Sequence, residues 1–212
     1  KEIVGFTYGS TDAYGFHGLE AVQALAEQRR GGETGVVAVR CLHGDAAWKA
    51  IDSGALDPAL FEAALGRVPG REKGEPLDRK AISDPKLMII EYRDGLKASL
   101  VELNPAIGAW TAAWSYEDGR PVESTQFWTQ EARSGAHFGL LLKGIESMML
   151  SGKPTWPVER TLLTSGVLDA LLQSHVHDGV RVETPYLDVQ NQPTWRWQDP
   201  PPPPPGRPWS EQ

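Results

Sequence analysis

The sequence predicts an α+β fold: an open, mainly antiparallel β-sheet with helices packed on one of its faces. Two Asp-Gly pairs, at 94–95 and 118–119, each separate two strand-like runs, and this dipeptide is a strong signal for a β-hairpin. Apolar residues at helical spacing lie before and after these four strands. Successive strands between helical segments are typical of an α+β domain with an antiparallel meander at its centre.

Each expected element has a pattern of its own. The glycine pair 31–32 ends the first helix, Asp57-Pro58 starts a later one, and the apolar run 36–42 is typical of a central strand covered on both faces. Residues 69–85, rich in charge, glycine and proline, are expected to be an exposed loop. In chain order we expect a strand over 2–8, a helix over 14–30, a strand over 36–42, helices over 45–51 and 58–65, strands over 87–92, 98–103, 110–116 and 122–129, helices over 138–149 and 158–172, and a short strand within 181–189.

The composition is that of a globular chain. Hydrophobic residues make up 40% and charged residues 23% of the 212, so the chain can bury a core without disulfides. We expect one domain over 1–193 and a Pro/Trp-rich tail over 194–212, whose proline run favours extended polyproline II. The chain begins at Lys1, directly before a strand-like run, which indicates a processed or truncated product.

Charge and cysteine content exclude several classes of function. The net charge is −7 and there is no basic run, so we expect no nucleic-acid partner. Cys41 is the only cysteine, which excludes an intrachain disulfide and a cysteine-based zinc site and fits a cytoplasmic location. No apolar run approaches the roughly 20 residues that span a bilayer, so we expect no membrane among the partners of this chain. A glycine-rich turn from strand to helix is also missing, so we expect this chain alone to bind no nicotinamide cofactor.

Asp12, His17 and Glu20 are the candidate catalytic residues. His17 and Glu20 are three residues apart and share a helix face, and an imidazole oriented by a carboxylate is the arrangement that a general acid or base needs. The alternative is that Asp12 caps the helix and His17 is a packed or solvated residue. A metal site at His175 and His177 is disfavoured, because residues two apart on a helix point in nearly opposite directions.

Aromatic residues are concentrated on the predicted meander. Trp110 and Trp114 are four apart and fall on one strand face, and Phe127 and Trp128 follow on the next strand. Such a set could stack on a sugar, or it could be buried against helices or a second subunit, since large aromatics dominate cores and interfaces.

Two groups of segments resemble the C-terminal domain of Gfo/Idh/MocA-type oxidoreductases. They are the segment 157–171 with Val182-Glu183-Thr184-Pro185, and the segment 14–21 with 31–36 and 44–50. The resemblance covers residues 3–190. It implies an α+β domain that binds a sugar or polyol derivative, forms a homo-oligomer through the open sheet face, and works with an N-terminal Rossmann domain that carries NAD or NADP.

The resemblance also assigns roles to residues. The family often has an Asp-x-x-x-His motif, whose histidine transfers a proton at the oxidised hydroxyl. His17 occupies the histidine position, Ala13 stands where the aspartate is expected, and Asp12 or Glu20 would orient the imidazole. We also expect Tyr14, Trp128 and His137 to line the substrate pocket. The rival interpretation is a non-catalytic scaffold module whose aromatic sheet holds a glycan or a partner, with the tail as an adaptor ligand.

Overall fold

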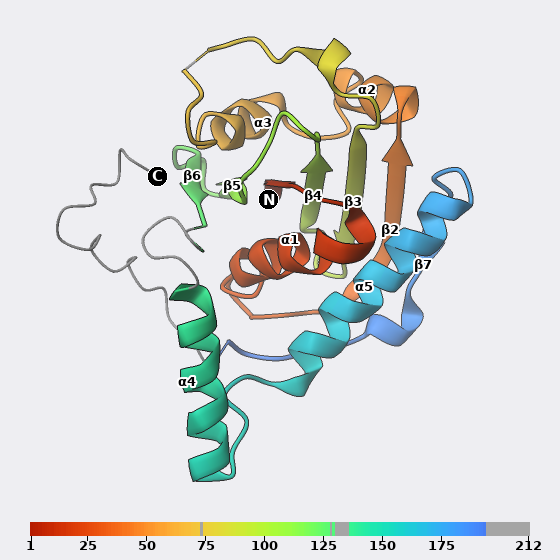
Figure 1. The fold of residues 1–212 in the computed structure, drawn as a ribbon. Helices are drawn as coiled ribbons and strands as arrows, with labels where there is room; N and C mark the ends of the chain where they lie inside the picture. The colour runs from red at the N-terminus through yellow and green to blue at the C-terminus, as the bar shows by residue number, and fades with distance from the viewer. Residues whose placement is uncertain (73, 128, 130–135, 194–212) are drawn as a thin grey trace, which may run out of the picture.

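The computed structural model describes residues 1–72, 74–127, 129 and 136–193, and it confirms the α+β class (Figure 1). The expected tail at 194–212 lies outside these residues. Within them the strands and helices follow the predicted elements in order and type, but the first helix ends at Ala26, before the glycine pair 31–32 that was expected to end it. The strands are β1 (Glu2–Thr7), β2 (Val36–His43), β3 (Lys86–Tyr92), β4 (Lys97–Glu102), β5 (Thr111–Ser115), β6 (Glu123–Gln126) and β7 (Val182–Glu183), and the helices are α1 (Thr11–Ala26), α2 (Asp45–Asp52), α3 (Pro58–Leu65), α4 (Ala136–Ser151) and α5 (Val158–Val176).

The described strands form one open sheet in the order β6-β5-β1-β4-β3-β2-β7. Both predicted hairpins are present, and Gly95 and Gly119 in their turns have positive φ angles of 84° and 74°, which glycine adopts without strain. The prediction that the four strands form one continuous meander is wrong. β1 lies between the two hairpins, parallel to β4 and antiparallel to β5. β1 can take this place because both of its faces are apolar.

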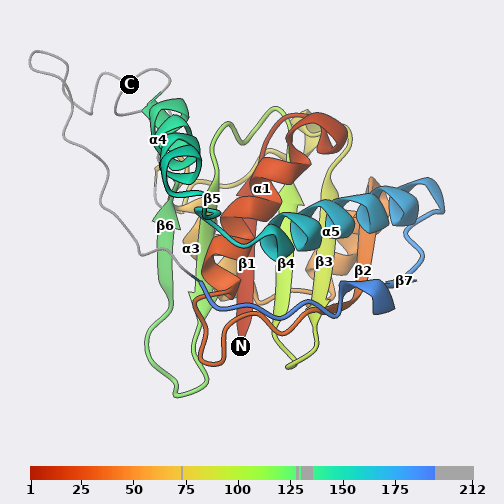
Figure 2. The same cartoon turned by 90° about the horizontal axis from the view of Figure 1, so that it is seen from below.

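Helices cover both faces of the sheet rather than one, which corrects the predicted arrangement. α1 and α5 pack on one face with Ile3, while α2 and α3 pack on the other face with Val4 and Phe6. The physical reason is the alternation of side chains along β1, which gives each face its own apolar cluster. In Figure 2, α1 and α5 lie in front of the strands and α3 lies behind them.

The run 36–42 does form a strand covered on both faces, but β2 is next to last in the sheet rather than central. The two-residue strand β7 lies at the edge of the sheet beyond β2 and pairs with Ala38 and Val39 of that strand. The loop over 69–85 is present and contains a short 3₁₀ turn, Arg79–Ala81. Among the described residues, no helix has the length and apolar character needed to cross a membrane.

Helix α4 stands apart from the rest of the fold. It projects away from the sheet in both views (Figures 1 and 2), and no other described helix or strand packs extensively against it. The chain reaches it after β6 and returns through residues 152–157 to α5. On the side of the sheet that α1 and α5 cover, β5 and β6 are therefore less covered than β1 and β2, whereas α3 covers their other side.

Candidate functional site

The carboxyl ends of β1 and β4 meet at one edge of the sheet, because these neighbouring strands are parallel and Thr7 pairs with Glu102. Glu102 ends β4 with only 1% of its surface exposed. Its carboxylate accepts hydrogen bonds from the Thr11 hydroxyl at 2.7 Å, from Lys86 Nζ at 2.7 Å and from Asn104 Nδ2 at 3.1 Å. A buried carboxylate is stable only with such partners. We call these four residues the Glu102 network.

Asn104 ties the turn between β1 and α1 to the Glu102 network. Its side-chain oxygen accepts a bond from the Gly9 amide at 3.0 Å, and its Nδ2 donates to the Gly9 carbonyl at 2.8 Å. Gly9 has φ +76°, and a Cβ there would lie 2.6 Å from the ring of Tyr14. The turn is thus held in one conformation with the tyrosine ring packed directly on it.

Lys86 is the counter-charge of Glu102. It also lies 3.3 Å from Asp84, an exposed carboxylate that precedes β3. Burial by itself lowers the pKa of the Lys86 ammonium, but the hydrogen bond and charge of Glu102, together with Asp84, outweigh burial and raise that pKa. Lys86 therefore stays charged at neutral pH.

Four rings surround the start of α1 and form what we call the aromatic cluster: Tyr8, Tyr14, His17 and Trp110. The centroid of Trp110 lies 4.5 Å from that of Tyr8 and 5.8 Å from that of His17, and Tyr14 lies 6.1 Å from His17. Trp110 is buried and donates from Nε1 to the Thr7 hydroxyl at 3.1 Å. The imidazole of His17 and the ring of Tyr14 are exposed. The cluster is an aromatic surface beside a fixed polar network.

The structure brings together only part of the predicted site. Tyr14 and His17 are neighbours, and Asp12 lies exposed in the first turn of α1. A hydrogen bond from Ser10 is the main cause that lowers the pKa of Asp12. In the described part of the chain, no carboxylate pairs with His17. The imidazole is therefore held by ring contacts rather than by an acid.

Glu20 points to α5 instead of to His17. Its carboxylate pairs with Arg160 and accepts a hydrogen bond from the Thr164 hydroxyl at 2.7 Å. Arg160 also pairs with the buried Glu27 at 2.9 Å. Because these partners fix the side chain against α5, the expected orienting contact between Glu20 and His17 is not formed, and Glu20 instead joins the two helices.

The other predicted pocket residues are not placed at the aromatic cluster. His137 lies in the first turn of α4, with Nδ1 3.0 Å from the Thr129 carbonyl oxygen and its ring centroid 4.1 Å from that of Phe138. No contact between His137 and the cluster is present among the residues the structure describes. Trp128 lies outside those residues.

Sequence reasoning missed the Glu102 network, although a signal for it was present. In the hairpin that turns at 94–95, Lys86 and Glu102 are directly opposite one another. Opposite charges at facing positions of an antiparallel pair interact across the strands. Counting back from the Asp-Gly turn would have paired them.

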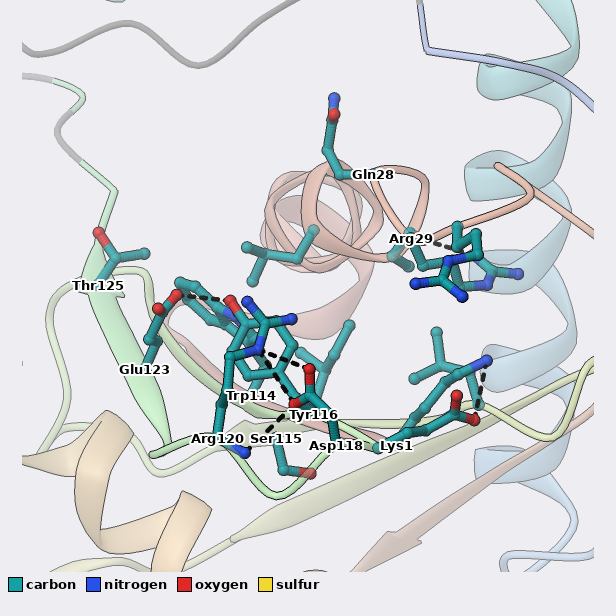
Figure 3. Close-up of a pocket in the computed structure, with 16 residues that line it drawn as sticks. Lys1, Gln28, Arg29, Trp114, Ser115, Tyr116, Asp118, Arg120, Glu123 and Thr125 are labelled. Atoms are coloured by element: carbon teal, nitrogen blue, oxygen red, sulfur yellow. Dashed lines mark hydrogen bonds and ion pairs between the residues drawn. The ribbon is translucent and has the colours of Figure 1, made fainter.

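A cavity of about 930 Å³ lies at the opposite end of β1, between the end of α1 and the β5–β6 hairpin (Figure 3). Trp114 Nε1 donates to the Tyr116 hydroxyl at 2.9 Å, and that hydroxyl donates to Glu123 at 2.6 Å. The guanidinium of Arg120 lies 3.7 Å from the Tyr116 ring centre and pairs with Asp118. This cavity is the part of the sheet face that the helices leave open.

Trp110 and Trp114 thus belong to different places, at opposite ends of β5. Trp110 is buried in the aromatic cluster, and Trp114 lines the cavity and is half-buried. The predicted open face with a continuous aromatic set is reduced to this cavity, because α1 covers the sheet between them.

The turn between β1 and α1 differs from the turn that binds a dinucleotide in a Rossmann domain. The turn between β1 and α1 is the place where a Rossmann domain binds pyrophosphate on glycine amides. Here that turn reads Tyr8-Gly9-Ser10-Thr11, its single glycine is bonded to Asn104, and the ring of Tyr14 fills the adjoining space. No group of three or more metal-ligating side chains occurs among the described residues either.

Chemically, the edge formed by the aromatic cluster and the Glu102 network offers ring faces, a phenol and an exposed imidazole on a rigid support. Such groups can stack on an apolar ring face and exchange hydrogen bonds with hydroxyls.

No protein-family model matches the sequence, and no curated protein is significantly similar to it.

Proposed function

We propose that this chain binds a sugar- or polyol-like molecule at the aromatic cluster, as the substrate-binding domain of a nicotinamide-dependent oxidoreductase. The observation that carries the proposal is the exposed pair Tyr14 and His17 beside the buried Trp110, above the fixed turn at Gly9. Sugar rings have apolar faces that stack on aromatic rings, and their hydroxyls bond to phenol and imidazole groups. The redox part rests on the sequence resemblance alone.

His17 is the proton-transfer group in this proposal. Its imidazole is exposed, and a neutral imidazole nitrogen can accept a proton from a substrate hydroxyl. The Glu102 network acts indirectly, because it fixes the N-terminal turn of α1 that carries Tyr14 and His17. NAD or NADP would be held by another domain, and the lack of a glycine-rich turn between β1 and α1 supports this part of the proposal.

Binding can be tested on the 212-residue chain itself. Monosaccharides and polyols are titrated while tryptophan fluorescence and the His17 ring NMR signals are followed. Tyr14→Ala and His17→Ala should each weaken binding by about tenfold or more, the scale of losing a central aromatic contact. Tyr186→Ala, another exposed tyrosine, is the matched control. Binding that is unchanged in both Tyr14→Ala and His17→Ala would contradict the proposal.

The catalytic role needs a preparation in which the chain works together with a nicotinamide-binding domain. There His17→Ala should lower kcat by about a hundredfold or more, the usual scale for a lost general acid or base. Loss of stability with unchanged turnover per folded molecule would instead show that His17 is only a packing residue.

A second candidate function is glycan binding in the cavity at Trp114, without catalysis. The cavity supports it, since Trp114 and Tyr116 lie next to Asp118, Arg120 and Glu123, a set typical of sugar recognition. Two alanine variants distinguish the two candidate binding sites. Trp114→Ala should abolish binding and His17→Ala should not, if the cavity rather than the aromatic cluster is the site.

A further inference from the structure

Helix α4 exposes large apolar side chains along most of its length. Met149 and Leu150 expose 77% and 83% of their surfaces. The others are Phe138, Leu140, Leu141, Leu142 and Met148. Contiguous apolar surface of this kind marks an interaction site in a protein that folds in water.

One side of α4 is already covered by the chain that follows it. A Cβ at Gly144 would lie 2.8 Å from the ring of Trp156, and the Thr155 hydroxyl donates to the Gly144 carbonyl. With 3.6 residues per turn, Leu142, Glu146 and Met149 lie on the opposite side. That side carries a shallow groove of about 500 Å³, lined by Leu142, Lys143, Ile145, Glu146, Met149 and Leu150.

The charges beside this groove are self-complementary. Lys143 and Glu146 are the only charged residues of α4, and both border the stripe formed by Leu142 and Met149 on the same side. When two identical helices pack antiparallel about a two-fold axis near residues 144–145, the same edges meet. Lys143 then faces the partner's Glu146, and Glu146 faces the partner's Lys143.

We propose that α4 is a dimerisation helix, which pairs antiparallel with α4 of a second copy of this chain. The apolar stripe supplies the buried area, and the two reciprocal ion pairs fix the direction and register of the helices. This goes beyond the proposed function, which it neither needs nor supports. It also places self-association on α4 rather than on the sheet face.

A second copy fits this surface better than a membrane does. Helices that lie on lipid surfaces carry several Lys and Arg residues on their polar side, which attract anionic headgroups. α4 has one lysine balanced by one glutamate, on a chain of net charge −7. An acidic protein with a charge-balanced apolar helix can meet its own copy there with little repulsion.

The test is the dissociation constant of the dimer, measured by sedimentation equilibrium on the 212-residue chain. Leu142→Glu should raise this constant by about tenfold or more, because it places a charge in the buried stripe. Lys143→Glu and Glu146→Lys should each weaken the dimer, since each sets like charges opposite one another. The double variant Lys143→Glu/Glu146→Lys should recover most of the loss, because the reciprocal pairs are re-formed with reversed sign.

Val180→Glu, at an exposed apolar residue beyond α5, is the matched control and should leave the dimer unchanged. Circular dichroism and thermal melting verify that every variant is folded. A chain that stays monomeric, a dimer indifferent to Leu142→Glu, or single-charge variants that the double variant does not rescue would each overturn the proposal. So would a monomer that binds phosphatidylcholine vesicles through α4.

Discussion

At the scale of single residues, the structure separates groups that are chemically available from groups that only support the fold. Tyr14 and His17 are exposed, whereas Glu102 and Cys41 are buried. The buried polar groups are held by several hydrogen bonds, because an unpaired buried charge would be costly. Reactivity is therefore expected only at the exposed members of the candidate site.

Cys41 should be inert while the protein is folded. It lies in the core at 0% exposure, and burial, the largest cause, raises the pKa of its thiol to about 12. The thiolate is the nucleophile that attacks reagents such as iodoacetamide, and with this raised pKa it is almost absent at pH 8. Iodoacetamide should leave the native protein unmodified and label it completely in guanidinium chloride, as mass spectrometry would show. Rapid labelling of the native protein would contradict the burial.

Asp94 should contribute stability that is lost in acid. Burial raises the pKa of this carboxyl, but the hydrogen bond and charge of Arg29 lower it by a larger amount, so the net shift of the pKa is downward. A lowered pKa gives stability that is present above the unfolded value of about 3.9 and is lost as the pH falls through the folded value. At pH 7, Asp94→Asn should lower the unfolding free energy by about 1 kcal/mol.

The informative quantity for Asp94 is the difference in unfolding free energy between the wild type and Asp94→Asn, measured as a function of pH. Chemical denaturation at several pH values should show this difference shrinking below about pH 4, as the wild-type carboxyl takes up its proton. A difference that stays constant down to pH 2 would mean that charge has no part in the effect.

At the scale of elements, the helices differ in how closely they pack. Gly18 of α1 faces the sheet, where a Cβ would lie 2.7 Å from the Thr7 hydroxyl and 2.8 Å from Leu100, while Gly139 of α4 has open space around it. Gly18→Ala should lower the unfolding free energy by about 1–3 kcal/mol through overpacking. Gly139→Ala should be neutral or slightly stabilising, because alanine favours a helix by about 1 kcal/mol over glycine.

Urea denaturation of the two glycine variants measures this contrast directly. The same substitution is made in two helices, so the difference between them reports the local space rather than helix propensity. Equal effects at both positions would show that α1 does not pack on β1 as closely as described.

The sequence predicted elements better than their partners in space. Asp-Gly turns and apolar spacing located both hairpins and every long helix, because these signals are local. The insertion of β1 between β4 and β5 was missed, since no residue of β1 encodes which of several compatible neighbours it joins. The contacts of Glu102 with Thr11 and of Glu20 with Arg160 were missed for the same reason, because these partners are distant in sequence. The pairing of Lys86 with Glu102 could have been found from the hairpin register. The exposed pair Tyr14 and His17 was found because both lie on one helix.

At the scale of the whole molecule, one sheet separates two apolar clusters. Leu171 lies in the cluster under α1 and α5, and Leu60 lies in the cluster under α2 and α3. The strands between them contribute to both, so we expect the clusters to unfold together. Leu60→Ala and Leu171→Ala should each lower the unfolding free energy by about 2–5 kcal/mol.

Each leucine variant should still show a single transition that coincides by circular dichroism and by tryptophan fluorescence. Two separate transitions in either variant would mean that the layers are independent folding units, and that the shared sheet does not couple them.

The position of β1 has a consequence for the timing of synthesis. Its two neighbours, β4 and β5, lie about a hundred residues further along the chain, so β1 leaves the ribosome long before either of them. At about 5–20 residues per second, this strand waits roughly 5–20 s without a pairing partner. During that interval an apolar segment with free backbone groups is open to wrong pairing. The yield of folded protein should therefore depend on translation speed between β1 and β5, and on chaperones that shield nascent strands.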